Sequence, residues 1–229
     1  MGSRMPVNQP LLEKIREKVD RHFEVLFKRI LTASAEYGVF GISLLEKLHN
    51  ELPRTECENC GRCCNAISIF SIEYHHVIRQ LMARKDPGDL RRKIQTALRF
   101  EPRMAEVEGE FRLRCAFRDD ENRVCRIHPF RPFACRLFGL RHDDGTRECE
   151  KVREMNPGSS ITDSAREALQ ARILDIAESH EVEPGRAIGF FPLEFWLFRF
   201  ALGPGAALEI YREILVPAST PLTRFWRKS

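Results

Sequence analysis

The sequence of 229 residues has no run of about 18 uncharged apolar residues, which a membrane-spanning helix requires. The nearest stretch, residues 189–208, contains Glu194, Arg199 and two prolines. The N-terminal part also lacks the apolar segment of a secretory signal, because charged residues follow Leu11 almost at once. We therefore expect a cytoplasmic protein without a transmembrane segment.

The chain also has little net charge and little lysine. Its 37 Lys and Arg against 33 Asp and Glu give a formal charge of +4. Such a small excess does not favour a nucleic-acid partner, and we expect none. Hydrophobic residues make up 43% and charged residues 31% of the chain, which is ordinary globular usage and excludes wholesale disorder.

Apolar residues recur at helical spacing in both terminal parts of the chain. The first stripe is Leu12, Ile15, Val19, Phe23, Leu26 and Ile30, and the second is Ile161, Ala165, Leu169, Ile173 and Ile176. Capping and proline signals predict four shorter helices. The first begins at Ser43 and is stopped by Pro53, and the others span Ser71–Met82, Leu90–Leu98 and Pro204–Leu215. A short strand is predicted within residues 67–70.

These elements predict a mainly α fold with little β structure, arranged around an irregular, cysteine-rich, metal-binding centre. We divide the chain into an N-terminal helical segment (residues 1–50), a cysteine-cluster metal-binding domain (51–155) and a C-terminal helical segment (156–229), packed as one unit. The segment Phe190–Phe200 is apolar on nearly every side, which is typical of a buried helix. Its alternative role is a docking surface for a partner such as a protein or peptide substrate.

The eight cysteines are the most informative feature. Four of them fall within eight residues, as Cys57, Cys60, Cys63 and Cys64. A C-x-x-C turn lets two sulfur atoms reach one ion, and Gly61 suits such a turn. The repeated spacing C-x-x-C-x-x-C resembles the cysteine run that binds the clusters of bacterial-type ferredoxins. Cys63 and Cys64 have divergent side chains on adjacent Cα atoms, so we expect them to serve two neighbouring centres.

The remaining cysteines are solitary: Cys115, Cys125, Cys135 and Cys149. Eight thiolates match two sites of four, and clustered thiols in a reducing compartment indicate metal more often than disulfides. Zinc ribbons present two C-x-x-C pairs per ion, whereas the second half of this set has none. The spacing therefore favours iron–sulfur centres, most simply [4Fe–4S], with zinc as the alternative.

The segment from Cys125 to Arg136 has a further signature. Pro132 suits the first position of a helix, which would put Cys135 and Arg136 in its first turn, where the pKa of a thiol is lowered. We interpret His128 as a hydrogen-bonded structural residue rather than a ligand. Eight arginines lie between residues 112 and 141 and can offset the negative charge of thiolate centres. Among them, Arg131 and Arg136 are candidates to hold a carboxylate or phosphate of a cofactor.

At these residues the sequence resembles the cysteine-cluster family of zinc- or iron-chelating domains, which includes the flagellin lysine N-methylases. The family pattern C-x-x-C-G-x-C-C falls on residues 57–64. Its second part falls on Cys115, Cys125, Ile127, His128, Arg131, Pro132, Cys135 and Arg136, with Cys149 trailing. The resemblance implies chelation of zinc or iron by these cysteines, and it raises the possibility of a methylase that binds S-adenosylmethionine.

Three hypotheses follow from the sequence, and they leave open whether the protein is an enzyme. The first is an iron–sulfur protein with one or two centres that serves a redox reaction or a cluster-dependent modification. The second is a protein or peptide N-methylase, although the chain has no G-x-G-x-x-G after a strand to bind S-adenosylmethionine conventionally. The third is a zinc-organised interaction module.

Overall fold

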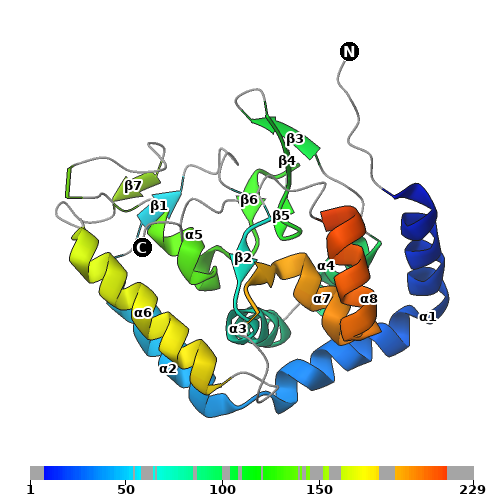
Figure 1. Cartoon of the computed structure of the whole chain (residues 1–229), viewed down its shortest axis with the longest axis horizontal. Helices are drawn as coiled ribbons and strands as arrows, with labels where there is room; N and C mark the ends of the chain where they lie inside the picture. The colour runs from blue at the N-terminus through cyan, green and yellow to red at the C-terminus, as the bar shows by residue number, and fades with distance from the viewer. Residues whose placement is uncertain are drawn as a thin grey trace.

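Helices dominate the computed structural model, which describes residues 8–53, 55–57, 64, 66–84, 87–99, 104–107, 110–119, 121–138, 140, 143–144, 152–154, 161–180 and 189–215. The helices are α1 Gln9–Glu36, α2 Val39–Glu51, α3 Ser71–Met82, α4 Pro87–Leu98, α5 Phe133–Leu137, α6 Asp163–Ser179, α7 Leu193–Leu202 and α8 Pro204–Ile210. A 3-10 turn covers His128–Phe130, and a π-helical turn, Tyr211–Leu215, continues α8. The mainly α prediction is confirmed (Figure 1).

The strands are short and form four antiparallel pairs. They are β1 Thr55–Cys57 with β7 Val152–Glu154, β2 Ser68–Ile69 with β8 Phe191–Pro192, β3 Met104–Val107 with β4 Glu110–Leu113, and β5 Arg118–Asp119 with β6 Val124–Cys125. Each pair joins only two to four residues per strand, so β structure is minor, as predicted. Each of the four pairs has at least one strand in the cysteine-rich part of the chain, residues 51–155, which the sequence predicted to be irregular.

Helix α1 begins at a cap and is bent in its middle. The Asn8 side chain accepts a hydrogen bond from the amide of Leu11 (3.1 Å), and Pro10 lies in the first turn. His22 departs from helical geometry (φ −127°, ψ 19°), and Figure 1 shows the resulting change of direction. All six residues of the first predicted stripe are buried, which confirms that face. Through it α1 packs against α3, α4 and α7.

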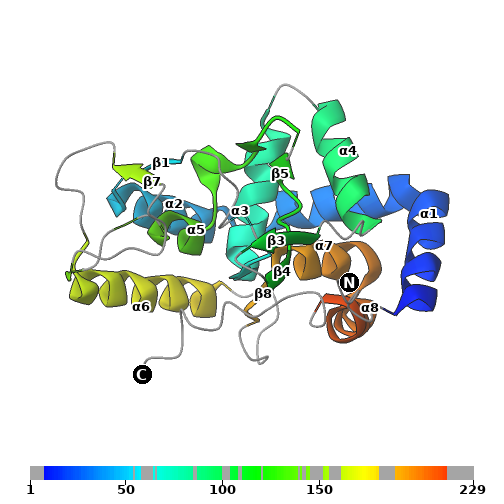
Figure 2. The same ribbon diagram turned by 90° about the horizontal axis from the view of Figure 1, so that it is seen from above.

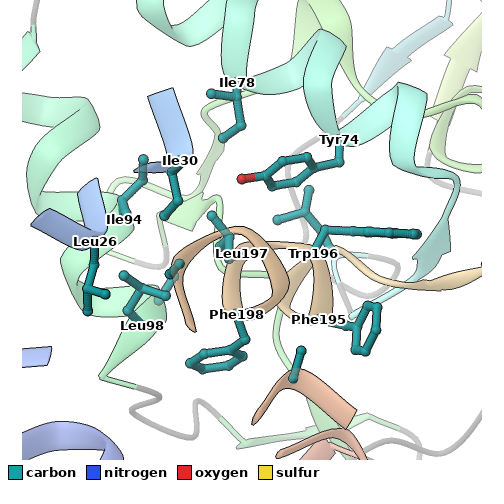
Figure 3. Packing of buried hydrophobic residues seen from close by; sticks show 14 of the residues in the cluster. Leu26, Ile30, Tyr74, Ile78, Ile94, Leu98, Phe195, Trp196, Leu197 and Phe198 are labelled. Carbon is teal, nitrogen blue, oxygen red and sulfur yellow. The ribbon is translucent and has the colours of Figure 1, made fainter. Parts of the chain in front are cut away.

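The larger core surrounds α7. Figure 3 shows Leu197 and Phe198 of α7 facing residues from α1, α3 and α4, and Figure 2 shows α3 and α4 side by side. The indole of Trp196 donates to the carbonyl of Ile69 (3.0 Å), which ties α7 to β2. Residues 192–198 are all buried. The apolar segment Phe190–Phe200 is therefore core in this structure, and a docking role would require these side chains to leave it.

The smaller core lies between α2, α3, α5 and α6, and α6 runs along α2 (Figure 1). Two predictions were wrong in detail here. Ser43 lies inside α2, which already begins at Val39 after the Gly38 cap. In the second stripe Ala165 is exposed, and its neighbour Arg166 is buried instead because its guanidinium donates to the carbonyl of Leu140 (3.3 Å).

Within the described ranges, the helices are all too short or too polar to span a bilayer. The predicted helices at Ser71–Met82 and Pro204–Leu215 are confirmed, although the latter ends in a π-helical turn. The helix predicted from Leu90 begins earlier, at Pro87, since proline is compatible with a first helical turn. The proposed boundaries at residues 50 and 155 remain predictions.

Candidate metal centre

Four of the eight predicted ligands lie fully within the described chain. Cys64, Cys115, Cys125 and Cys135 are all half-buried, and none of them forms a disulfide bond. Cys57 lies in β1, of which the backbone is described, whereas Cys60, Cys63 and Cys149 lie outside the described residues. The geometry of the site can therefore be built from the four described thiols.

Backbone hydrogen bonds bring three of these cysteines together. The amide of Cys115 donates to the carbonyl of Cys64 (3.0 Å), although 51 positions separate them in the sequence. The carbonyl of Cys115 accepts from the amide of Arg118 (3.0 Å), which turns the chain into β5. In the β5–β6 pair Arg118 stands opposite Cys125. Three separate chain segments thus meet in one small region.

Cys135 reaches the same region on α5, and a buried carboxylate fixes that helix. Glu73, 3% exposed, accepts from the amide of Phe133 through Oε1 (2.7 Å) and from the amide of Phe70 through Oε2 (3.1 Å). It therefore joins the N-termini of α3 and α5. Burial raises the pKa of the Glu73 carboxyl to about 7, while the two amides and nearby Arg136 oppose that rise.

The four thiols share one electrostatic neighbourhood. Burial is the largest cause that raises the pKa of Cys115, and the charges of Cys125 and Cys135 raise it further. Burial likewise raises the pKa of Cys135, Cys125 and Cys64 add to the rise, and Arg131 opposes it. The Cys135 pKa is thus not lowered at the helix N-terminus as predicted, because burial in a low dielectric outweighs the effect of the short α5.

The described donors do not form a site for one ion. Among the residues that the structure describes, no three His, Cys, Asp or Glu side chains are arranged to hold a single metal ion. Four thiols nevertheless converge from three chain segments and influence each other's ionisation.

A second buried carboxylate, missed by the sequence reasoning, lies beside Cys115. Glu194 is 4% exposed, and its Oε1 accepts from the amide of Ala116 (3.2 Å), the residue after Cys115. Burial raises the pKa of Glu194, and the Glu194 charge raises that of Cys115. Its signal in the sequence was a single acid within the apolar segment Phe190–Phe200, where an unpaired charge is costly.

The predicted cofactor residues contact their own chain. Nη1 of Arg131 lies 3.2 Å from Nε2 of His128, and the Arg136 guanidinium donates to the carbonyls of Arg131 (3.0 Å) and Pro129 (2.8 Å). These contacts tie the 3-10 turn to α5. They agree with a structural role for His128, whose pKa is lowered by burial, Arg131 and Arg136. Binding of a cofactor by either arginine remains a prediction.

In the sequence, the other cysteines lie in or next to the two strands of the β1–β7 pair. Cys57 stands opposite Val152, and the antiparallel register continues to Thr55 opposite Glu154. Residue 58 follows Cys57 and residue 151 precedes Val152, so both chain segments join the pair at the same end. One of these segments carries Cys60 and Cys63 and the other carries Cys149.

Three buried histidines, His49, His75 and His76, were also missed by the sequence reasoning. The rings of His49 and His76 are 5.5 Å apart, and Nδ1 of His76 lies 3.6 Å from a carboxylate oxygen of Glu46. Burial lowers the pKa of His49 to about 2 and that of His76 to about 4, and Arg136 lowers both further. His75, stacked on Tyr37, has a pKa lowered by burial to about 3. These imidazoles are therefore neutral in the folded chain.

We expect His49→Leu to stabilise the protein, and increasingly so at lower pH. Neither His49 ring nitrogen has a hydrogen-bond partner among the described residues, so an apolar side chain removes a desolvation cost. Below about pH 6.5 the unfolded chain binds a proton at His49 that the folded chain does not, so wild-type stability falls. The advantage of the variant should grow by roughly 1.4 kcal/mol per pH unit from about pH 6.5 to 5.

Urea unfolding of both proteins at several pH values measures this difference. His22→Leu removes an imidazole at an exposed position and serves as the control. A difference between His49→Leu and wild type that stays constant from pH 7 to pH 5 would contradict a buried neutral imidazole.

Comparison with known proteins gave one match, to the cysteine-rich part of the chain. Residues 56–156 match the family model CxxCxxCC, described as a putative zinc- or iron-chelating domain. No curated protein and no solved structure gave a match to the chain. The matched segment contains all eight cysteines and excludes α1, α2 and α6–α8. Over residues 56–156, less than half of its length, this chain is thus similar to the CxxCxxCC family of zinc- or iron-chelating domains.

Proposed function

We propose that the eight cysteines hold thiolate-ligated metal, in the form of iron–sulfur centres. The observation that carries this proposal is the convergence of Cys64, Cys115, Cys125 and Cys135 within a domain of a metal-chelating family. The donor set fits such a group, because soft thiolates bind iron–sulfur clusters and zinc. A metal cation would also supply the positive charge that four half-buried thiols and two buried carboxyls need in order to ionise together.

The contacts also support a division of the cysteines into two sets. The first set would be the four described thiols, Cys64, Cys115, Cys125 and Cys135. The second would be Cys57, Cys60, Cys63 and Cys149, whose chain segments join the same end of the β1–β7 pair. This division agrees with the expectation that the adjacent Cys63 and Cys64 serve different centres.

The sequence favours a cluster over zinc in the first set. Cys115, Cys125 and Cys135 are solitary cysteines, whereas a zinc ribbon presents two C-x-x-C pairs per ion; Cys64 alone comes from the C-x-x-C-x-x-C-C run. A cluster would serve electron transfer or a cluster-dependent modification, in a cytoplasm where free thiols persist.

The proposal predicts that Cys125→Ser removes about one centre, and thus about half of the metal. Serine nearly preserves the shape of the side chain but replaces the soft thiolate with a hydroxyl, a poor ligand for iron–sulfur clusters. Val124→Thr is the matched control, since it makes a similarly small change at the preceding position of β6 without removing a thiol. Metal per chain is measured by elemental analysis after anaerobic purification.

Full metal content in Cys125→Ser would overturn the proposed ligand set. Loss of all metal would overturn the division into two independent centres. The methylase alternative predicts that S-adenosylmethionine binds the metal-loaded chain, which isothermal titration calorimetry measures directly.

A further inference from the structure

Two buried glutamates, Glu73 in α3 and Glu194 in α7, each accept a backbone amide beside a cysteine of the first set. Oε1 of Glu73 accepts from the amide two residues before Cys135, at 2.7 Å. Oε1 of Glu194 accepts from the amide that follows Cys115, at 3.2 Å. Each carboxylate therefore holds the backbone of a segment that carries one proposed ligand.

Each carboxylate also binds the start of its own helix. The second oxygen of Glu73 accepts from the amide of Phe70, the N-cap residue of α3, at 3.1 Å. The carboxylate of Glu194 is bonded by its own backbone amide in the first turn of α7. A buried amide without an acceptor costs stability, so these bonds favour one arrangement of the two backbones that each glutamate joins.

The two glutamates stand on one frame, the β2–β8 pair. Strand β2 leads through Phe70 into α3, and β8 leads directly into α7. Because the pair is antiparallel, the two helices leave it at opposite ends. The indole of Trp196 donates to the carbonyl of Ile69 (3.0 Å) and fixes α7 to β2. The larger core, in which α3 and α7 are buried, therefore determines where the two carboxylates lie.

The ionisation of the two thiols shows the same pairing. Burial is the largest cause that raises the pKa of Cys115, and the charge of Glu194 is the next. Burial is again the largest cause for Cys135, and the charge of Glu73 adds to the rise in its pKa. Each thiol is thus close to the carboxylate that holds its own segment.

On the basis of the metal centre proposed above, we propose that Glu73 and Glu194 are positioning residues, which hold Cys135 and Cys115 at the separation that the first centre requires. The helical core then places two of the ligands. Groups that orient metal ligands typically contribute about 10–100-fold to metal affinity. Because β8 and α7 lie outside residues 56–156, metal binding would depend on a part of the chain beyond the matched segment.

Substitution of each glutamate by glutamine and by methionine tests this assignment. Glutamine keeps one acceptor oxygen, whereas methionine has a similar length and only a weakly accepting sulfur. We expect Glu194→Met to lose iron to a competing ferrous chelator at a concentration at least ~10-fold lower than wild type, with Glu194→Gln in between. Glu73→Met and Glu73→Gln should follow the same order. The visible circular dichroism of the loaded protein should change in parallel, because it reports the arrangement of ligands around the metal.

Cys125→Ser provides the background that separates positioning from general stability. It keeps only the second centre, so adding Glu194→Met should not change the chelator resistance of the remaining metal. Phe198→Ala, at another buried position of α7, should lower the free energy of unfolding and leave the visible spectrum of the loaded protein as in wild type.

The assignment is overturned if the methionine variants keep the wild-type spectrum and chelator resistance, or if the second centre loses its metal equally. Wild-type protein that binds no metal would overturn the proposed function itself, which separates the two failures.

Discussion

Removal of the metal should unfold the cysteine region and leave the helical core in place. Strands β5 and β6 pair over two residues each, and α5 has five residues. Isolated two-stranded pairs and helices of this length are marginal in water. Structural metal binding releases on the order of 10–16 kcal/mol in zinc-finger peptides, comparable to the whole stability of a typical domain, and we expect a cluster to matter similarly.

Hydrogen exchange of the metal-loaded and chelated protein measures this effect. Amides of Cys115, Arg126 and Arg136, which hydrogen-bond to other parts of the backbone, should lose their protection on chelation. Amides of α1 and α6 should keep much of theirs, since their buried faces lie in the two cores. Equal protection of the cysteine region with and without metal would show that the fold does not depend on the metal.

Phe198→Ala should have the second largest effect, a loss of about 3–5 kcal/mol in the free energy of unfolding. Phe198 is 0% exposed and faces the core from the middle of α7 (Figure 3). Truncation removes apolar contact area and leaves a cavity that the surrounding helices fill only in part. Urea unfolding of the metal-loaded variant gives the difference directly.

The matched control for this prediction is Phe40→Ala, because Phe40 is 69% exposed. Exposed substitutions of this kind usually change stability by less than about 0.5 kcal/mol. Similar small losses for both variants would indicate that α7 is not core in solution and would favour the docking-surface interpretation of Phe190–Phe200.

The sequence predicted the fold best where hydrophobic periodicity was strong. The stripe from Leu12 to Ile30 is buried along its whole length, because an amphipathic helix has one apolar face to cover. Capping signals predicted the helix boundaries less accurately. Ser43 matched a capping box but lies inside α2, since the apolar residues before it continue the helix. Arg166 was missed because its burial depends on the carbonyl of Leu140, a tertiary contact that no local pattern shows.

The candidate site was predictable in its thiols but not in their surroundings. Cysteine spacing identified the metal-chelating family, which the comparison confirmed. Glu73 and Glu194 are ordinary helix residues in the sequence, and only the β2–β8 pairing brings them to the cysteine segments. Burial of Cys135 likewise depends on packing, so its raised pKa could not be predicted from its place at a helix N-terminus.

The most direct test of the account is the metal and acid-labile sulfide content of protein purified without oxygen. Iron–sulfur centres on the eight cysteines predict a coloured protein with broad visible absorption and comparable amounts of iron and sulfide. That content should fall by about half in Cys125→Ser. Stoichiometric zinc without labile sulfide, in a colourless protein, would contradict the iron–sulfur proposal and favour a zinc-organised module on the same cysteines.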